Sequence, residues 1–150
     1  MAKTIKIPLQ QISLEAEGYH LFINVELNNK PAILLVDTGA SKTVFDINRI
    51  SKFIRKRKKA FESFEQHSTG LGTNSMESHF TKINEFSISE LKLKDFTAIL
   101  LDMTHVNQSY ETLGLPTIDG VLGSDLLMKY NAVIDYEKKI LKLKIFKISN

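Results

Sequence analysis

The chain has 150 residues, of which 43% are hydrophobic and 25% charged, and this length fits one compact domain over residues 1–150 without room for a second lobe of similar size. The absence of cysteine excludes a thiol nucleophile, a cysteine-based zinc site and disulfide bonds. The four histidines form no metal-binding pattern, and we expect neither a metal nor an organic cofactor.

The distribution of charge bears on location and partners. The segment from Met1 to Pro8 alternates charged and apolar residues and lacks the continuous apolar stretch of a signal peptide or membrane span, so a cytoplasmic protein without a membrane partner is expected. The net charge of +3 includes five consecutive cations at Arg55–Lys59. A solvated helix face is the favoured interpretation of this basic run, and a contact with nucleic acid or an acidic surface is the alternative.

The first third of the chain contains segments with the apolar pattern of strands. Lys3–Ile7 alternates lysine with apolar residues, as a strand with one buried face does. Residues 19–36 predict two strands joined by a turn at Asn28–Pro31. The second of these strands, Ala32–Val36, is apolar on both faces and is expected to be buried.

A helix and a glycine-containing hairpin are predicted next. Asp46 is a candidate N-cap, and apolar residues then recur at helical spacing to about Glu65, with the basic run mostly on the opposite face. Residues 66–83 are polar and β-tolerant around a glycine-rich centre, which predicts a mobile hairpin. The tip of this hairpin consists of Gly70, Leu71, Gly72, Thr73 and Asn74.

Short strands dominate the second half of the sequence. The candidates are Glu85–Ser89, Leu91–Lys94, Phe96–Leu101, Ala132–Tyr136 and Ile140–Ile148. Met103–Pro116 predicts a polar loop, and Ser124 is a natural N-cap for a short helix. The alternation slips where Ile145 adjoins Phe146, which predicts a bulge or a change of buried face. Many short strands at close spacing predict an all-β, barrel-like domain with one or two helices.

The most specific chemical signal is an acid at the exit of a buried strand. The apolar run that ends at Val36 leads into Asp37-Thr38-Gly39, where glycine permits an immediate tight turn. Such a triplet alone is a weak signal, because an aspartate that starts a turn is the ordinary alternative. The context strengthens it, since the glycine-tipped hairpin follows and a second apolar-apolar-glycine element, Val121–Gly123, precedes a short helix.

In this order the motifs resemble those of the retropepsin family of aspartic proteases. The resemblance runs from about Tyr19 to Leu143, and Ile118–Leu127 and Val133–Tyr136 look like the bacterial retropepsin-like proteins. It implies an all-β acid-protease barrel with a flap hairpin. The activity that it implies is hydrolysis of extended peptides by direct attack of water.

The resemblance also implies roles for individual residues. Asp37 would be the catalytic acid, and the flap that closes on the substrate would be centred on Gly70–Asn74. An element that crosses beneath the catalytic loop would consist of Val121, Leu122 and Gly123. The catalytic loop itself would be supported by Thr38, Gly39 and Ala40, and in the family the hydroxyl at the Thr38 position bonds to the opposite loop of a dimer.

A homodimer is the economical source of a complete site. The chemistry needs two carboxylates that share a proton, because one activates water while the other donates to the scissile carbonyl oxygen. The sequence has no second Asp-Thr-Gly or Asp-Ser-Gly, and Asp119-Gly120 lacks the intervening hydroxyl residue. We therefore expect Asp37 of one subunit to face Asp37 of the other, with proton losses that belong to the pair.

Ala40 predicts a pH optimum shifted toward neutral. Pepsin-like enzymes often carry Ser or Thr at the corresponding position, where the hydroxyl can bond the ionised carboxylate and lower its pKa. Alanine offers no such donor, although Ser41 is an alternative donor one residue further on.

Two alternatives to the enzyme interpretation stay open. One is a non-catalytic dimerisation or peptide-binding module that kept the fold, because a fold does not guarantee its usual activity. The other makes the basic run at Arg55–Lys59 a nucleic-acid contact, beside or instead of proteolysis. Asp102, Asp125 and Asp135 have structural interpretations, as a strand exit, a first-turn helix acid and a hairpin entry.

Overall fold

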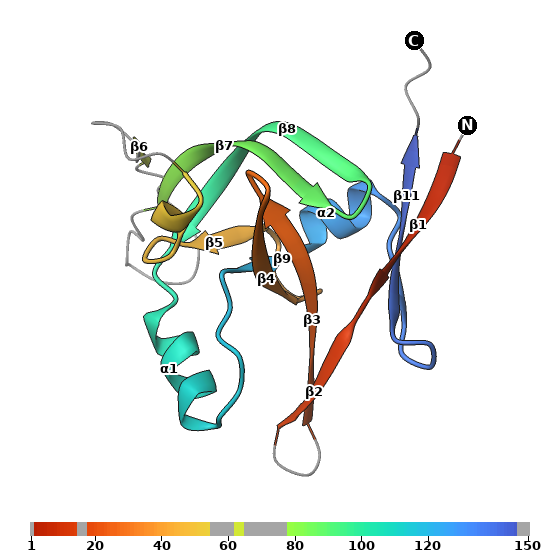
Figure 1. Cartoon of the computed structure of the whole chain (residues 1–150), viewed down its shortest axis with the longest axis horizontal. Helices are drawn as coiled ribbons and strands as arrows, with labels where there is room; N and C mark the ends of the chain where they lie inside the picture. Colours follow the sequence, from red (N-terminus) through yellow and green to blue (C-terminus); the bar gives the residue numbers. More distant parts are fainter. Residues whose placement is uncertain (1, 15–17, 55–61, 65–77, 147–150) are drawn as a thin grey trace.

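The computed structural model of the chain describes residues 2–14, 18–54, 62–64 and 78–146. In chain order the elements are β1 (Ala2–Pro8), β2 (Gln10–Leu14), β3 (Gly18–Leu27), β4 (Lys30–Val36), β5 (Val44–Asp46), the 3₁₀ helix η2 (Ile50–Lys52), β6 (Glu62–Phe64), β7 (Ser78–Ile88), β8 (Leu91–Leu101), α1 (Thr104–Thr112), β9 (Gly120–Leu122), α2 (Ser124–Lys129), β10 (Val133–Asp135) and β11 (Ile140–Phe146) (Figure 1). Within the described ranges, no helix has the length and apolar character needed to cross a membrane.

Most strands belong to one sheet that closes on itself. Its order is β2-β3-β4-β9-β5-β8-β7-β6, and β3 also pairs with β7. The six strands β3, β4, β9, β5, β8 and β7 therefore form a closed barrel. Asn28 reinforces the closure, because its backbone N–H donates to the carbonyl of Glu85 at 2.9 Å and its side chain binds the Glu85 amide at 3.0 Å. The predicted all-β barrel is confirmed.

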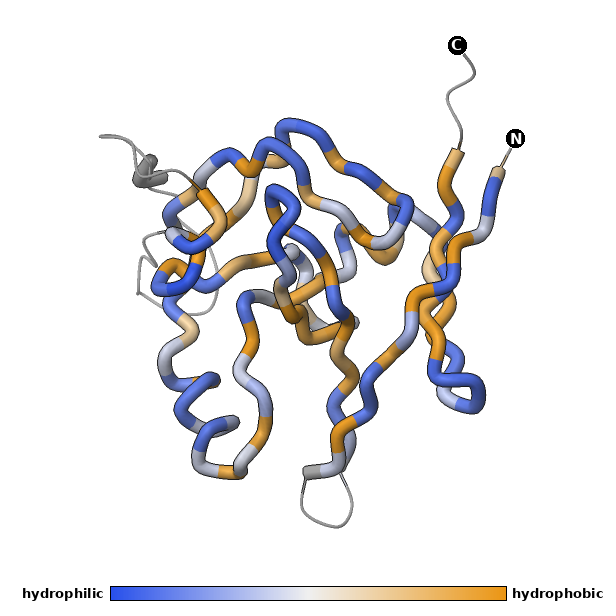
Figure 2. Tube along the Cα trace, viewed as in Figure 1, coloured by the Kyte–Doolittle hydropathy of each residue, from blue (hydrophilic) through white to orange (hydrophobic). Residues whose placement is uncertain are grey.

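Strand β4 separates two hydrophobic clusters. Leu34 and Val36 belong to the main core inside the barrel, whereas Ile33 and Leu35 contact a smaller second cluster on the other face. The buried members of the second cluster are Phe22, Val44, Met103, Tyr110 and Ile118. Figure 2 shows the hydrophobic stretches where β4, β5 and β9 cross the middle of the molecule. The predicted burial of this apolar strand is confirmed for the face of Ala32, Leu34 and Val36, whereas Ile33 and Leu35 on the other face are partly buried.

The two ends of the described chain lie side by side in a second sheet of order β1-β11-β10. The register of β1 and β11 is continuous from Ala2 opposite Phe146 to Pro8 opposite Ile140. Ile145 stays in phase with the buried Leu143, while Phe146 points outward and is 71% exposed. Both terminal strands were therefore predicted correctly, but the predicted bulge or change of face at Ile145 and Phe146 is wrong, because the alternation does not slip.

The hairpins follow their turn residues. Asn28 and Asn29 have φ values of 50° and 64°, a left-handed conformation that Asn tolerates better than other side chains, and they join β3 to β4 as predicted. The three strand candidates between Glu85 and Leu101 form only two long strands, β7 and β8. Their turn lies at Ser89, which also has a positive φ of 54°.

The helix predicted from Asp46 to about Glu65 is wrong. Asp46 ends strand β5, the only helical turn in the described part of that segment is η2, and Glu62–Phe64 forms strand β6. The apolar spacing that suggested a helix is real, because Ile47, Ile50 and Ile54 contact the barrel core, but they reach it from a 3₁₀ turn and bends. The basic run Arg55–Lys59 lies outside the described residues.

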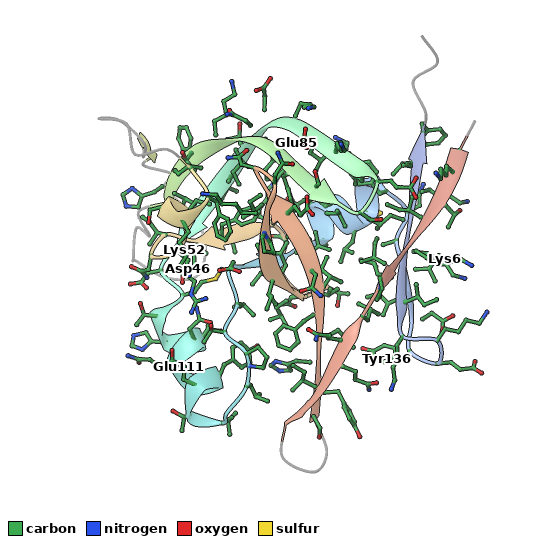
Figure 3. All side chains as sticks on the ribbon, viewed as in Figure 1. Lys6, Asp46, Lys52, Glu85, Glu111 and Tyr136 are labelled. Carbon is green, nitrogen blue, oxygen red and sulfur yellow. The ribbon has the colours of Figure 1, made fainter. Side chains whose placement is uncertain are left out.

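The polar loop predicted at Met103–Pro116 is also wrong, because Thr104–Thr112 forms helix α1. This helix buries only Asn107 and Tyr110, so its sequence carries almost no apolar periodicity. Hydrogen bonds of Asn107 attach the helix in place of apolar contacts. They join its side chain to the amide and carbonyl of Ile118, at 2.8 and 3.0 Å, and to Asp46 at 3.2 Å. Figure 3 shows Asp46 beside η2, next to the start of α1.

Asn107→Ala should lower the free energy of unfolding by about 1–3 kcal/mol, because the buried amide and carbonyl of Ile118 and the Asp46 carboxylate would each lose a partner. Chemical denaturation followed by circular dichroism measures the change. Gln108→Ala is the matched control, since its side chain is exposed on the same helix. Equal stability of the two variants would show that Asn107 does not anchor α1.

Candidate active site

Asp37 stands at the exit of β4, a strand held between β3 and β9. Its backbone N–H donates to the carbonyl of Leu122 at 3.0 Å, so the β4–β9 ladder extends to the acid itself. Its Oδ1 accepts the N–H of Gly39 at 2.9 Å, and its carbonyl accepts the N–H of Ala40 at 3.2 Å. The triplet therefore forms a tight turn that orients one carboxylate oxygen.

Val121–Gly123 lies directly against this turn. Strand β9 runs parallel to β4, with Val36 opposite Leu122, and the N–H of Ser124 donates to the carbonyl of Ala40 at 2.7 Å. A Cβ atom at Gly123 would lie 2.6 Å from the Lys42 carbonyl oxygen and 2.8 Å from that of Ala40. Because both neighbours are backbone atoms, only glycine fits, and the spacing between the two loops depends on it.

Helix α2 begins differently from the prediction. Gly123 is its N-cap residue and Ser124 is already inside the helix, so the predicted Ser124 N-cap is wrong. The close backbone contact at Gly123 explains the shift, since the chain must leave β9 in an extended conformation before the helix starts.

Asp125 fastens the loop of Asp37 to α2. Its carboxylate accepts the backbone N–H of Thr43 at 3.0 Å and the Thr43 hydroxyl at 2.7 Å. The Thr43 Oγ1 in turn accepts the N–H of Gly123 at 3.0 Å. The sequence analysis interpreted Asp125 only as an acid in the first turn of a helix. The one feature that could have indicated its contact with Thr43 is its position two residues after Gly123.

Asp119 occupies the other end of the β4–β9 pair. Its Oδ2 accepts the N–H of Ile33 at 2.9 Å, and its own N–H donates to the Ile33 carbonyl at 2.8 Å. Arg49 lies 3.5 Å from its Oδ1. This carboxylate is therefore engaged in holding two strands together.

The remaining predicted site residues divide into two groups. Thr38 and Gly39 are exposed and Ala40 is partly buried, all on the turn of Asp37. The predicted flap, Gly70–Asn74, lies outside the described residues. Among the residues that the structure describes, no group of three His, Asp or Glu side chains is arranged to hold a metal ion.

Two residues beside the site have no counterpart in the sequence predictions. The Nδ1 atom of His20 lies 2.7 Å from the hydroxyl oxygen of Tyr110, and the two rings meet edge to face with centroids 5.6 Å apart. Burial of the phenol, and secondarily the negative charge of Asp37, raise the pKa of Tyr110. The phenol is therefore a neutral group within electrostatic reach of Asp37.

A closed barrel with an Asp-Thr-Gly turn packed on an apolar-apolar-glycine element is the architecture of the retropepsin-like aspartic proteases. The family model described as aspartyl protease matches residues 23–126, and the chain belongs to this family.

Known proteins similar to this chain agree with that assignment. The chain is 25% identical over 123 residues to DNA damage-inducible protein 1 of Saccharomyces cerevisiae; this match covers 82% of the chain and only 25% of the yeast protein. A retropepsin-like aspartic protease from Rickettsia conorii has a similar fold, with a TM-score of 0.58, 22% identity and coverage of 96% of this chain and 92% of that one. The retroviral protease-like domain of Ddi1 from Leishmania major gives a TM-score of 0.50 at 14% identity, covering 83% and 87%.

Asp125→Asn should lower both the free energy of unfolding, by about 1–3 kcal/mol, and any activity of the Asp37 loop. The amide oxygen is an uncharged and weaker acceptor, and the amide NH2 group would replace a carboxylate oxygen that accepts the Thr43 N–H. Urea denaturation and an activity assay measure the two effects. Glu111→Gln, an exposed acid-to-amide change on α1, is the matched control (Figure 3). An Asp125→Asn variant as stable and active as this control would contradict the fastening role.

Proposed function

We propose that this chain is a homodimeric aspartic endopeptidase in which the Asp37 carboxylates of two subunits form one active site. The observation that carries the proposal is the placement of a partly exposed Asp37 on a turn fixed by Gly39 and Leu122. Membership of the aspartyl protease family supports it. The presence of one Asp-Thr-Gly triplet per chain supports the need for a second subunit.

The proposed reaction uses the two carboxylates in different protonation states. The ionised Asp37 removes a proton from a water molecule, which attacks the scissile carbonyl carbon, while the protonated partner donates to the carbonyl oxygen. The carboxylates repel one another when both are charged, so the pair retains one proton over a useful pH range. The Gly39 N–H would hold Oδ1 of each acid in place during this exchange.

The proposed dimer uses the exposed turn of Asp37. Thr38 is exposed beside the acid, which suits the expected hydroxyl contact with the opposite loop. The terminal strands pair within one chain, β1 with β11, so a second subunit can reach this sheet only along an edge strand or across a face. We expect the short strand β10, at one edge, to be available for that contact.

The proposed substrate is an extended peptide segment. An extended chain offers its own N–H and carbonyl groups to a flap hairpin, which gives main-chain recognition with pockets for alternate side chains. Gly70 and Gly72 remain the proposed flap glycines. A non-catalytic peptide-binding module of the same fold is the alternative that the following experiment separates.

Asp37→Asn should abolish peptide cleavage, with a loss of at least about 100-fold, because the amide can neither accept the proton from water nor donate as an acid. Turnover of a peptide mixture, followed by mass spectrometry, measures the loss. Asp95→Asn is the matched control, since Asp95 is exposed on β8 with a φ of 52° that Asn tolerates. Unchanged turnover by Asp37→Asn would remove this residue from the mechanism.

The same pair of variants tests assembly. Sedimentation over a concentration series should show reversible dimers for the wild type and for both variants, because neither change removes the proposed contact surface. Activity of the wild type should rise with dimer fraction. A cleaving wild-type chain that stays monomeric at every concentration would contradict the shared site.

Ala40→Thr should move the acid limb of the pH–activity profile to lower pH. A hydroxyl that bonds the ionised carboxylate stabilises its charged form and lowers its pKa, so the carboxylate stays ionised in more acidic solution. The wild type, without that donor at position 40, should have its optimum nearer neutral. A wild-type maximum at pepsin-like acidity, or a profile that Ala40→Thr leaves unmoved, would count against this explanation.

A further inference from the structure

The hydrogen-bonded pair of His20 and Tyr110 has no role in the proposed reaction, although it lies beside Asp37. Tyr110 is 4% exposed, and its ring also meets Phe22 edge to face with centroids 5.8 Å apart. A buried hydroxyl is costly unless it is paired, and the Tyr110 hydroxyl finds its partner in Nδ1 of the partly buried His20. The pair is thus a specific contact between strand β3 and helix α1.

The strand register places His20 on the side of Asp37. In the antiparallel pairing of β3 and β4, Phe22 lies opposite Leu35 and Ile23 opposite Leu34. Continuing this register past the end of β4 sets His20 opposite Asp37. Because residues two apart share a sheet face, His20 and Asp37 face the same side as Phe22 and Leu35, the side covered by the second cluster.

Helix α1 reaches this side of the barrel through three polar anchors. At its start, Asp102 accepts hydrogen bonds from the Thr104 N–H at 3.0 Å and from Asn48 at 2.8 Å. In its middle, Asn107 binds Ile118, and near its end Tyr110 binds His20. Of these three contacts, only the one between Tyr110 and His20 joins α1 to β3, one of the two strands that pair with β4.

We propose that the His20–Tyr110 hydrogen bond holds α1 as one wall of the peptide-binding cleft and thereby sets selectivity for the substrate side chain next to the scissile bond. The inference rests on the proposed endopeptidase function. His20 and Tyr110 are positioning residues, because they act through the placement of α1 and not on the reacting atoms. With the bond intact and α1 held in place, we expect small side chains at this position to be preferred over large ones.

The chemistry of the pair suits a permanent link. In a neutral imidazole, Nδ1 can accept a hydrogen bond from the phenol hydroxyl. In a protonated imidazole, the Nδ1–H can donate one to the phenol oxygen, so the hydrogen bond persists when His20 changes its charge. Burial, and secondarily the negative charge of Asp37, raise the pKa of Tyr110, which favours the protonated phenol. The hydrogen bond can therefore hold the two rings together in either protonation state of His20.

The test compares the full-length chain and its variants on two peptides that differ only in having Ala or Phe next to the scissile bond. Tyr110→Phe keeps the ring but loses the bond, so α1 can move outward and the kcat/KM ratio of the Phe to the Ala peptide should rise about 10-fold. The change should appear mainly in KM. Tyr136→Phe, on an exposed tyrosine of the β10–β11 turn, is the matched control and should leave the ratio unchanged (Figure 3).

His20 variants supply the independent arm, including the case in which Tyr110→Phe fails to fold. His20→Ala should raise the ratio as Tyr110→Phe does, and the double variant should raise it no further, because both changes remove one bond. His20→Asn should keep the wild-type ratio, since its amide oxygen can accept a hydrogen bond from the Tyr110 hydroxyl near the position of Nδ1. Lower stability with an unchanged ratio in all variants would overturn the inference while leaving the endopeptidase function intact. Absence of cleavage by the wild type would overturn both.

Discussion

The parallel pairing of β4 with β9 is the constraint on which the site depends. At one end of this pair the Asp119 carboxylate and backbone bind Ile33, and at the other the Asp37 amide continues the ladder to Leu122. Because β4 and β9 are parallel neighbours, their carboxyl ends lie side by side, and the two loops that follow them start next to each other. Gly123 then sets how closely they approach, and Asp125 ties the first loop to the helix after the second.

This arrangement explains how a carboxylate can be presented at the end of an apolar strand. Leu34 and Val36 are committed to the barrel core and Ile33 and Leu35 to the second cluster, so the strand is anchored on both faces up to Asp37. The acid is partly exposed and accepts the N–H of Gly39. In the proposed function it is therefore rigid in position yet open to a second carboxylate.

The sequence predicted the features that follow from local pattern. Alternating polarity or a continuous apolar run correctly predicted β1, β3, β4 and β11. Asn28 and Asn29 correctly indicated the turn between β3 and β4. The Asp37-Thr38-Gly39 turn at a strand exit was also recognised from local pattern, whereas the roles of Asp37 and Val121–Gly123 came from the family resemblance and stay predictions. Helix α1 escaped notice because Asn107 and Tyr110 attach it through hydrogen bonds instead of an apolar stripe. The contacts of Asp125 and His20 are made with partners far along the chain, which single-sequence patterns do not report.

Helix α1 lies in the connection between β8 and β9, and the strand ladder on either side does not pass through it. Its attachments to the barrel are a few side-chain contacts at Asp102, Asn107 and Tyr110. Insertions, deletions or a different local structure in this connection would leave the register of the barrel strands intact. A change of this one segment would therefore alter the surroundings of Asp37 without changing the strand pairing that carries it.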